Sequence, residues 1–183
     1  MNARRILTSS FLCLLTAGAN GFSIYDSSST PNPVQLAPVT LTGTVTITTF
    51  PPPISCEFSV DAVVEQDING VEGTITITDA RLSTPGSVLC TAITPTSLPW
   101  VSNPIYDAAL PNVAGPGVPT NVDFNNAHIN ICGTATPFTT VFNNNSSSPN
   151  AAPSSLNVTT TFGSCAMNGL LVTTGPADVD IFK

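Results

Sequence analysis

The sequence predicts an all-β fold, an antiparallel β-sandwich or barrel of about nine to ten short strands stapled by two disulfides. Apolar residues recur at every second position in several segments, which is the period of a strand with one buried face. No segment keeps the 3.6-residue period of an amphipathic helix. Clusters of Gly, Pro, Asn and Ser separate the alternating segments and are typical of turns.

The first residues have the pattern of an export signal. Two arginines precede an apolar run over residues 6–17, and Ala17-Gly18-Ala19 offers the small residues of a cleavage site. The run is too short to span a membrane, and no later stretch is apolar and long enough to do so. Cys13 follows the bulky pair Phe11-Leu12, where a lipoprotein signal needs small residues. We therefore expect residues 1–21 to be removed as a signal peptide.

The charge of the remaining chain excludes some classes of partner. Without residues 1–21, Arg81 and Lys183 are the only cations, whereas all 11 acids remain. Nucleic acids and anionic membranes attract proteins through clustered cations, so neither is an expected partner. Low total charge with much Thr, Ser and Asn is typical of exported proteins. We expect a secreted protein, extracellular or on the outer surface of a bacterial cell.

The expected organisation is a Ser- and Pro-rich linker over residues 22–39 followed by a single all-β domain over residues 40–183. The domain begins with a strand over 41–47, in which apolar residues and Gly alternate with threonines. This strand lies outside both expected disulfide loops. It can pair within its own domain or be lent to a neighbouring subunit by strand addition.

A β-hairpin follows, between Cys56 and Cys90. Asn69-Gly70 predicts a two-residue type I′ turn, which places Val64 opposite Ile75 and all apolar residues on one face. The same register, continued further, would bury Asp79 and Arg81. We therefore predict a β-bulge near Asp79 that turns both side chains outward.

The rest of the chain alternates in short segments separated by proline, glycine and a polar loop over 143–153. Trp100, Ile105 and Tyr106 are the expected apolar anchors of the proline-rich middle. Further strands are predicted at residues 118–124 and 127–131, with a phase break at Asn125-Asn126, and at 138–142, 156–162, 165–173 and 179–182.

Four cysteines remain after removal of the signal peptide, and an even number in an exported chain indicates two disulfides. Three pairings are possible. The almost equal spacing and the repeated layout of strand, polar loop and strand favour Cys56–Cys90 and Cys132–Cys165. A zinc site is not expected, because the chain has no Cys-x-x-Cys and a single histidine.

No catalytic constellation is visible. His128 is expected on the polar side of a strand, and no Gly-x-Ser-x-Gly motif occurs. Residues 65–70 imitate the start of a calcium loop, but Thr76 stands where a bidentate glutamate is needed, and an Asn-Gly turn explains the same residues. Carboxylates on one hairpin face are interpreted as a solvated acidic surface rather than a glycosidase pair; they are Glu57, Asp61, Glu65 and Glu72.

Glycosylation patterns also occur, at Asn144, Asn145 and Asn157. In a chain with a bacterial type of signal peptide, we interpret these matches as incidental.

The run Cys90-Thr-Ala-Ile-Thr-Pro-Thr-Ser-Leu-Pro-Trp100 carries a family resemblance, together with the preceding strand over 74–82 and Gly163-Ser-Cys-Ala-Met-Asn-Gly169. Asn125-Asn126-Ala127 and Cys132-Gly133 lie between them. From residue 40 to residue 182 the chain resembles the bacterial alkane oxidation protein activators of the PraB type. It departs from them in its longer Asn/Ser loop and its acidic first hairpin.

The resemblance implies an exported, non-enzymatic protein that supports hydrocarbon utilisation or surface adhesion, without catalytic residues. From the residues themselves, no cofactor or metal is expected. Its expected partners are hydrophobic surfaces or other copies of itself. A second hypothesis is a fibre or pilus-like subunit that assembles by donating the N-terminal strand over 41–47. A third, an extracellular hydrolase, requires a triad or carboxylate pair that the sequence does not show.

Overall fold

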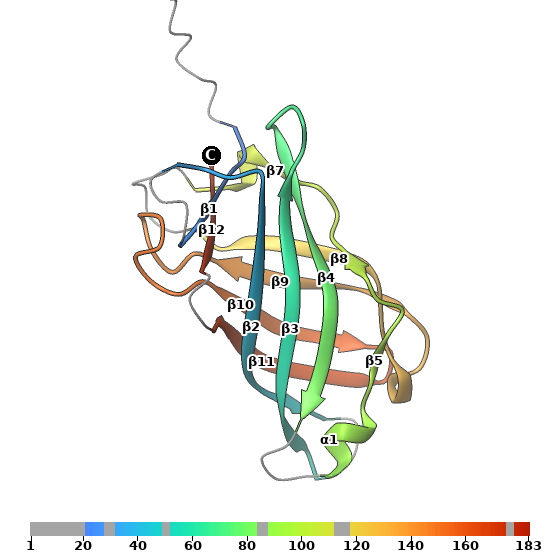
Figure 1. Ribbon diagram of the computed structural model, residues 1–183. Coiled ribbons are helices and arrows are strands. Elements are labelled where there is room, and N and C mark those ends of the chain that lie inside the picture. Colours follow the sequence, from blue (N-terminus) through green and yellow to red (C-terminus); the bar gives the residue numbers. More distant parts are fainter. Residues whose placement is uncertain (1–20, 28–31, 49–51, 84–87, 112–117, 175–177) are drawn as a thin grey trace, which may run out of the picture.

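The described part of the chain is built mainly of antiparallel strands (Figure 1). In this computed structural model it comprises residues 21–27, 32–48, 52–83, 88–111, 118–174 and 178–183. The expected signal peptide lies outside it except for Gly21. One curled sheet has the order β5–β8–β9–β10–β11–β2–β3–β4–β6, with β7 beside β4, and β1 pairs with β12 in a second small sheet. The all-β prediction is confirmed.

Most elements within the described residues are short, and the longest are three consecutive strands of the curled sheet, with 12, 13 and 12 residues. No helix among them is long and apolar enough to cross a bilayer. In chain order the elements are β1 (Ser23–Asp26), β2 (Leu36–Ile47), β3 (Ile54–Gln66), β4 (Glu72–Ser83), α1 (Val88–Ala92), β5 (Pro95–Thr96), β6 (Trp100–Val101), β7 (Ile105–Tyr106), η1 (Asp107–Ala109), β8 (Thr120–Ile129), η2 (Asn130–Cys132), β9 (Thr136–Asn143), β10 (Ser155–Phe162), β11 (Cys165–Thr173) and β12 (Val179–Phe182).

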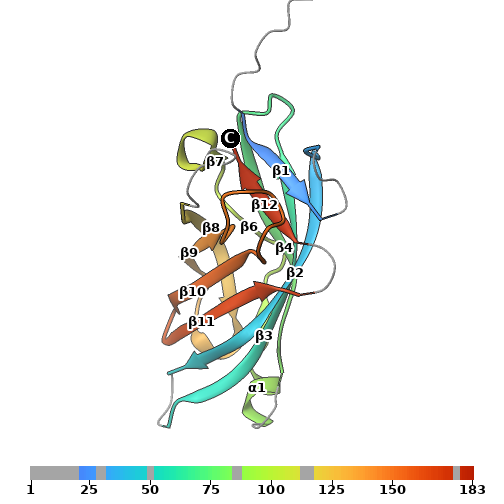
Figure 2. The ribbon, with the colours of Figure 1, turned by 90° about the vertical axis from the view of Figure 1, so that its left-hand side faces the viewer.

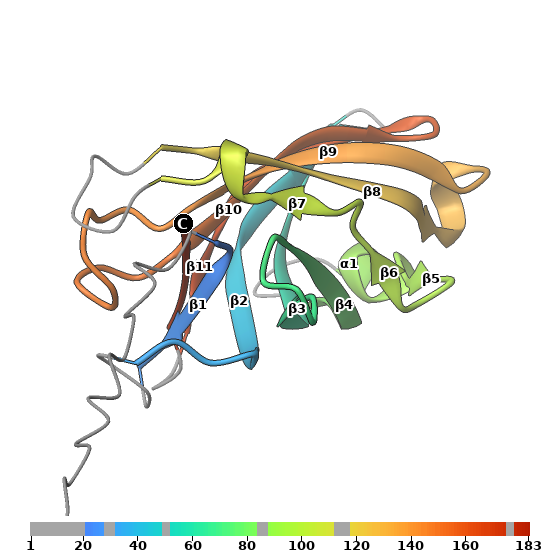
Figure 3. The same ribbon diagram turned by 90° about the horizontal axis from the view of Figure 1, so that it is seen from above.

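The segment between α1 and η1 closes the curled sheet on itself (Figure 3). β6 pairs with β4 at one edge, and β5 pairs with β8 at the other. Between these pairings, Ser102 forms a bridge with Phe124 of β8. Its N–H donates to the carbonyl oxygen of Ile75 at 2.9 Å, and its Oγ accepts the N–H of Ile75 at 2.9 Å. Ser102 therefore joins both edges, and the sheet becomes barrel-like.

The hairpin of β3 and β4 has the predicted register but a different turn. Val64 is paired with Ile75, as expected. The N–H of Asp67 donates to the carbonyl oxygen of Glu72 at 2.9 Å, so the loop is longer and spans 68–71. Gly70 has a φ of 68° whereas Asn69 does not have a positive φ, which a type I′ turn requires at both positions. The type I′ prediction is wrong, but both loop lengths place the same residues opposite one another.

The predicted bulge is present in β4. Asp61 is paired with Asp79 and the next residue, Ala62, with Ile77, so Thr78 is the extra residue. Beyond this shift Asp79 and Arg81 point outward, and the apolar side chains of the strand return to the core. Arg81 donates to Asp79 at 2.5 Å and to Asp61 at 3.0 Å, both on the outer face.

Both disulfides have the predicted pairing. Cys56–Cys90 links β3 to α1, and Cys132–Cys165 links η2 to the start of β11. In the chain-entropy model, closing loops of this length stabilises the fold by roughly 4 kcal/mol each.

A glycine allows β2 to lie close to β11. Gly43 occupies an inward position of the β2 alternation, between Leu41 and Val45, which are both buried. A Cβ on Gly43 would overlap the carbonyl oxygen of Leu170 in β11. The alternation that predicted this strand therefore includes one position where the partner backbone, rather than a side chain, fills the space.

The linker prediction for residues 22–39 needs correction. Phe22 and Ile24 are both fully buried, and β1 pairs residue by residue with β12 at the other end of the chain. β2 begins at Leu36, within the expected linker, rather than at Leu41. Figure 2 shows β1 and β12 together at the end of the barrel opposite α1. Composition alone did not reveal this role, because the partner strand lies far away in sequence.

The other edge of β12 is completed by a side chain. The amide of Asn144, which is 3% exposed, donates to the carbonyl oxygen of Ile181 at 2.8 Å and accepts the N–H of Ile181 at 3.1 Å. Within the described part of the chain, β12 has no neighbouring strand on this side, and Asn144 supplies the hydrogen bonds instead.

Asp180 is a buried carboxylate in the same strand. It accepts the N–H of Asn150 at 2.5 Å and the hydroxyl of Ser154 at 3.0 Å. Burial, assisted by the negative charge of Asp178, outweighs these hydrogen bonds and raises the pKa of Asp180 from 3.8 to about 6. The folded state therefore binds this proton more tightly than the unfolded chain. The resulting stability is fully present below pH 3.8 and is lost as the pH rises through about 6.

We predict that Asp180→Asn removes this pH dependence. Between pH 4 and pH 7, the free energy of unfolding of the wild type should fall by roughly 2 kcal/mol relative to the variant. Urea titrations at a series of pH values measure the difference. Asp107→Asn, outside this network, should keep the wild-type slope. Parallel curves for wild type and Asp180→Asn would contradict the assignment.

Candidate functional site

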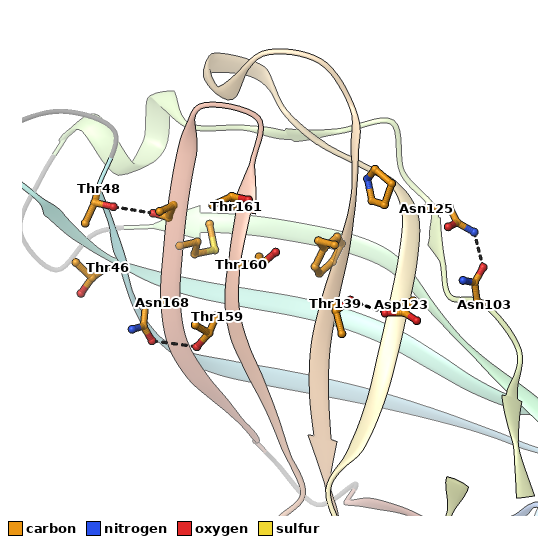
Figure 4. A pocket seen from close by; sticks show the side chains of 14 residues that line it. Thr46, Thr48, Asn103, Asp123, Asn125, Thr139, Thr159, Thr160, Thr161 and Asn168 are labelled. Atoms are coloured by element: carbon orange, nitrogen blue, oxygen red, sulfur yellow. Dashed lines mark hydrogen bonds between the residues drawn. The ribbon is translucent and has the colours of Figure 1, made fainter. Parts of the chain in front are cut away.

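The candidate site is a groove between two hairpins of the barrel, formed by β8–β9 and by β10–β11 (Figure 4). β9 and β10 are paired only from Ser155–Asn143 to Asn157–Val141. Beyond these pairs both strands continue but separate, and Figure 4 shows the two hairpins standing apart. The space between them is a β9–β10 groove of about 1140 Å³.

The open end of the groove is held by a disulfide. Cys132–Cys165 connects the tips of the two hairpins. The N–H of Ser164 donates to the carbonyl oxygen of Cys132 at 2.8 Å. Gly163 has a φ of 56°, and a Cβ there would overlap the same carbonyl oxygen. The hairpins therefore separate between two fixed points, the short ladder and the disulfide.

The walls of the groove are polar and nearly uncharged. Thr139 donates to Asp123 at 2.5 Å, and Thr159 donates to Asn168 at 3.3 Å. Among the described residues that line the groove, Asp123 is the only ionisable one. The full lining consists of Thr46, Thr48, Asn103, Asp123, Asn125, Pro137, Phe138, Thr139, Thr159, Thr160, Thr161, Ala166, Met167 and Asn168.

Buried apolar side chains lie beneath these walls. Phe138 is 5% exposed, and its ring centroid lies 4.8 Å from that of Phe162 in β10. Behind them Trp100 contacts both rings, with centroids 5.9 Å and 6.0 Å away. Phe124 stacks on Phe138 at 4.9 Å. Hydroxyl and amide groups over an apolar floor suit a neutral polar ligand better than an anion.

His128 is placed by structural hydrogen bonds. Its Nδ1 lies 2.7 Å from the hydroxyl of Thr96 in β5, and its Nε2 bonds to the carbonyl oxygen of Gly133. Because Gly133 supplies only an acceptor, Nε2 carries a proton, and in the neutral ring Nδ1 accepts from Thr96. His128 is half-buried rather than exposed, and it fastens β5 and the loop after η2 to β8.

The calcium-like segment forms a hairpin loop in which the Asp67 carboxylate accepts hydrogen bonds from backbone N–H groups of the same loop. Asp67 accepts N–H groups from Asn69 at 3.2 Å, Val71 at 2.9 Å and Glu72 at 3.3 Å. Slight desolvation raises the pKa of Asp67, but these N–H donors outweigh it and hold the pKa below its ordinary value. Thr76 lies within β4, opposite Val63. The described residues contain no group of three or more His, Cys, Asp or Glu side chains arranged to hold a metal.

The hairpin carboxylates are spread along β3 and β4. Asp61 is engaged by Arg81 at 3.0 Å and by the hydroxyl of Thr40 at 2.7 Å. Glu57 and Glu65 lie on the same face of β3, and Glu72 begins β4. None of these acids lines the β9–β10 groove.

Two of the three glycosylation-pattern asparagines have structural roles. Asn144 is buried against β12, and Asn145 donates to the carbonyl oxygen of Pro153 at 2.7 Å. Asn157 is exposed at the end of the β9–β10 pairing.

A second surface feature is the apolar tip of the β3–β4 hairpin, which projects from one end of the barrel (Figure 1). Ile68 is 97% exposed, and Val71 beside it is also exposed. Tyr106, expected as a core anchor, is exposed next to them and is paired with Glu72. We call Ile68, Val71 and Tyr106 the apolar tip.

The comparisons with known proteins assign the family. The family model described as alkane oxidation protein activator, PraA/PraB-like, matches residues 3–181. The chain belongs to this family. Searches of curated proteins and of solved structures gave no match. The PraA/PraB-like family is therefore represented here by a barrel stapled by two disulfides.

Sequence reasoning found the disulfides of this PraA/PraB-like protein but neither the groove nor the apolar tip. The groove depends on where β9 and β10 separate, which alternation within each strand does not reveal. Pro137 in β9 was one available signal, because proline cannot donate to a ladder. Ile68 within an otherwise polar turn was the signal for the tip.

We predict that the disulfide at the groove controls its rigidity. Replacing Cys132 and Cys165 by serine should lower the free energy of unfolding by roughly 4 kcal/mol and speed amide exchange in 136–140 and 158–162. Serine at Cys56 and Cys90 should cost a similar amount of stability without this local effect. Urea titration and hydrogen-exchange mass spectrometry below the unfolding transition measure both. Equal exchange in the two variants would show that the groove is held by other contacts.

Proposed function

We propose that this chain is an exported, non-enzymatic surface protein that supports the use of hydrocarbons by contacting hydrophobic material. Membership of the alkane oxidation activator family carries the proposal. The signal-like segment over residues 1–21 and two disulfides fit an oxidising, extracellular environment.

The apolar tip is the surface we assign to hydrophobic contact. Ile68 exposes nearly its whole side chain, and its neighbours Val71 and Tyr106 extend the apolar area. A projecting turn reaches an oil surface before the rest of the barrel does. Burying an aliphatic side chain there is favourable by about 1.5–3 kcal/mol.

The test is growth of a strain that lacks the protein. On a long liquid alkane it should grow more slowly than the parent, with unchanged growth on acetate. The wild-type gene should restore growth, and a variant with Ile68→Ser and Val71→Ser should restore it only in part. Val88→Ser, which changes an exposed apolar residue on α1 at the opposite end, should restore it fully.

Binding measurements on the purified proteins distinguish direct contact with hydrocarbon from an indirect effect on growth. Retention of the tip variant on hexadecane droplets should fall severalfold relative to wild type and to Val88→Ser. Normal growth and attachment of the deletion strain on alkanes would remove the hydrocarbon part of the proposal.

The β9–β10 groove is the surface we assign to adhesion. Its threonine and asparagine side chains both donate and accept hydrogen bonds, and it contains no cation to attract an acidic polymer. These features favour an uncharged, hydroxyl-rich chain such as a neutral polysaccharide.

We therefore predict that dextran retards the native protein in affinity electrophoresis more strongly than the acidic polysaccharide alginate does. Thr159→Ala combined with Asn168→Ala should weaken the retardation several-fold. The matched control is Thr44→Ala, an exposed threonine of β2 outside the groove lining. Equal retardation of all three proteins would exclude the groove as the binding surface.

Donation of the strand over 41–47 is not the mechanism we favour for a fibre. β2 is paired with β3 along its whole length and with β11 on its other side. Removing it would open the centre of the barrel.

A further inference from the structure

β1 belongs to a separate two-stranded sheet. Within the described residues it pairs with β12, and the curled sheet contains neither of these two strands. In addition to this pairing, Ile24 of β1 forms a single β-bridge with Val34. All described strands of the barrel, and β12 itself, begin at Leu36 or later in the chain. The surface that receives β1 is therefore built by the rest of the chain.

That surface is a socket shaped for Phe22. The ring of Phe22 lies against Gly73 of β4, where a Cβ would overlap it. The N–H of Phe22 donates to the carbonyl oxygen of Gly70 at 2.8 Å, and its own carbonyl oxygen accepts the side-chain amide of Gln66. Phe22 is fully buried, so the socket would expose apolar surface if β1 left it.

The remainder of β1 is held by backbone pairing and one ring contact. The register runs from Ser23–Phe182 to Asp26–Val179. The carbonyl oxygen of Asp26 accepts the side chain of Asn150 at 2.9 Å. Tyr25 and Phe182 meet edge to face at 5.9 Å. The same contacts would form if β1 came from a second copy of the chain.

The sequence between β1 and β2 comprises residues 27–35, and a fully extended chain of that length measures about 30 Å. Pro33 fixes its own φ and biases Asn32 toward extended backbone. The N–H of Val34 donates to the carbonyl oxygen of Ile24 at 2.8 Å, a contact that an exchanged β1 would make with Val34 of the accepting copy. β1 is also the first described strand, next to the segment expected to be removed, so no folded element precedes it among the described residues.

We propose that β1 is exchanged between copies of this chain, so that Phe22 and Ile24 of one copy fill the socket of the next. Each copy then both donates and accepts a strand. Mutual exchange closes a dimer, whereas exchange from one copy to the next extends a fibre. Because the contacts are the same in both arrangements, protein concentration and the reach of residues 27–35 set the balance between them.

The experiment places single cysteines on the two paired strands of different copies. Asp26→Cys in one tagged copy and Val179→Cys in another are coexpressed as full chains with their own leader, purified after export and oxidised mildly. Chymotryptic peptides are then analysed by mass spectrometry. Exchange predicts a disulfide between residue 26 of one copy and residue 179 of the other, with a yield that rises at least several-fold with concentration.

The control uses a pair that cannot exchange. Glu65→Cys and Thr74→Cys face each other across the β3–β4 hairpin, whose short loop keeps both strands in one chain. Their cross-copy yield measures random collision. If the yield for 26–179 equals this background while the variant carrying both cysteines links them within one chain, β1 stays in its own copy and the proposal is wrong.

The result does not depend on the hydrocarbon role. A protein that never exchanges β1 still presents its apolar tip and its β9–β10 groove. Conversely, exchange without an effect on alkane growth would support assembly alone.

Discussion

The contact of Trp100 with Phe138 and Phe162 is the interaction on which most of the barrel depends. Trp100 belongs to the short segment that closes the sheet, and the two phenylalanines come from the strands that separate at the groove. Its indole N–H donates to the carbonyl oxygen of Thr96 at 2.8 Å, so this fully desolvated ring still has its polar group satisfied. Closure of the barrel and the floor of the groove are therefore one packing arrangement.

The features that depend on residues close together in sequence were predicted from the sequence. The β4 bulge followed from the single observation that a continuous register would bury Asp79 and Arg81, and the disulfides followed from spacing. The turn was predicted wrongly because a two-residue loop and a loop over 68–71 give the same pairing of Val64 with Ile75. The core contribution of Phe22 was not predicted, because its ring packs against Gly73 of β4, which lies far away in sequence. The groove likewise depends on a relation between strands.

The end of the barrel that holds β1 and β12 is unusually polar for an interior. Ser154 is fully buried and bonds both the carbonyl oxygen of Val179 and the carboxylate of Asp180. Asn144 supplies both hydrogen bonds of a missing strand to Ile181. Such groups fix one geometry because each loses its partner if the strand shifts. The register of the terminal strands is therefore set by side chains as well as by the backbone ladder.

The scarcity of cations, used above to exclude acidic partners, also determines how the protein is cut. Trypsin cleaves after lysine and arginine, and beyond residue 21 these are Arg81 and the final residue, Lys183. Arg81 lies within the β3–β4 ladder and is bonded to Asp61 and Asp79. Beyond residue 21, Arg81 is thus an internal site for trypsin-like proteases, and in the folded molecule that site is inside a sheet. Trypsin therefore yields few and long peptides from the residues beyond 21, and mapping them requires a protease of another specificity.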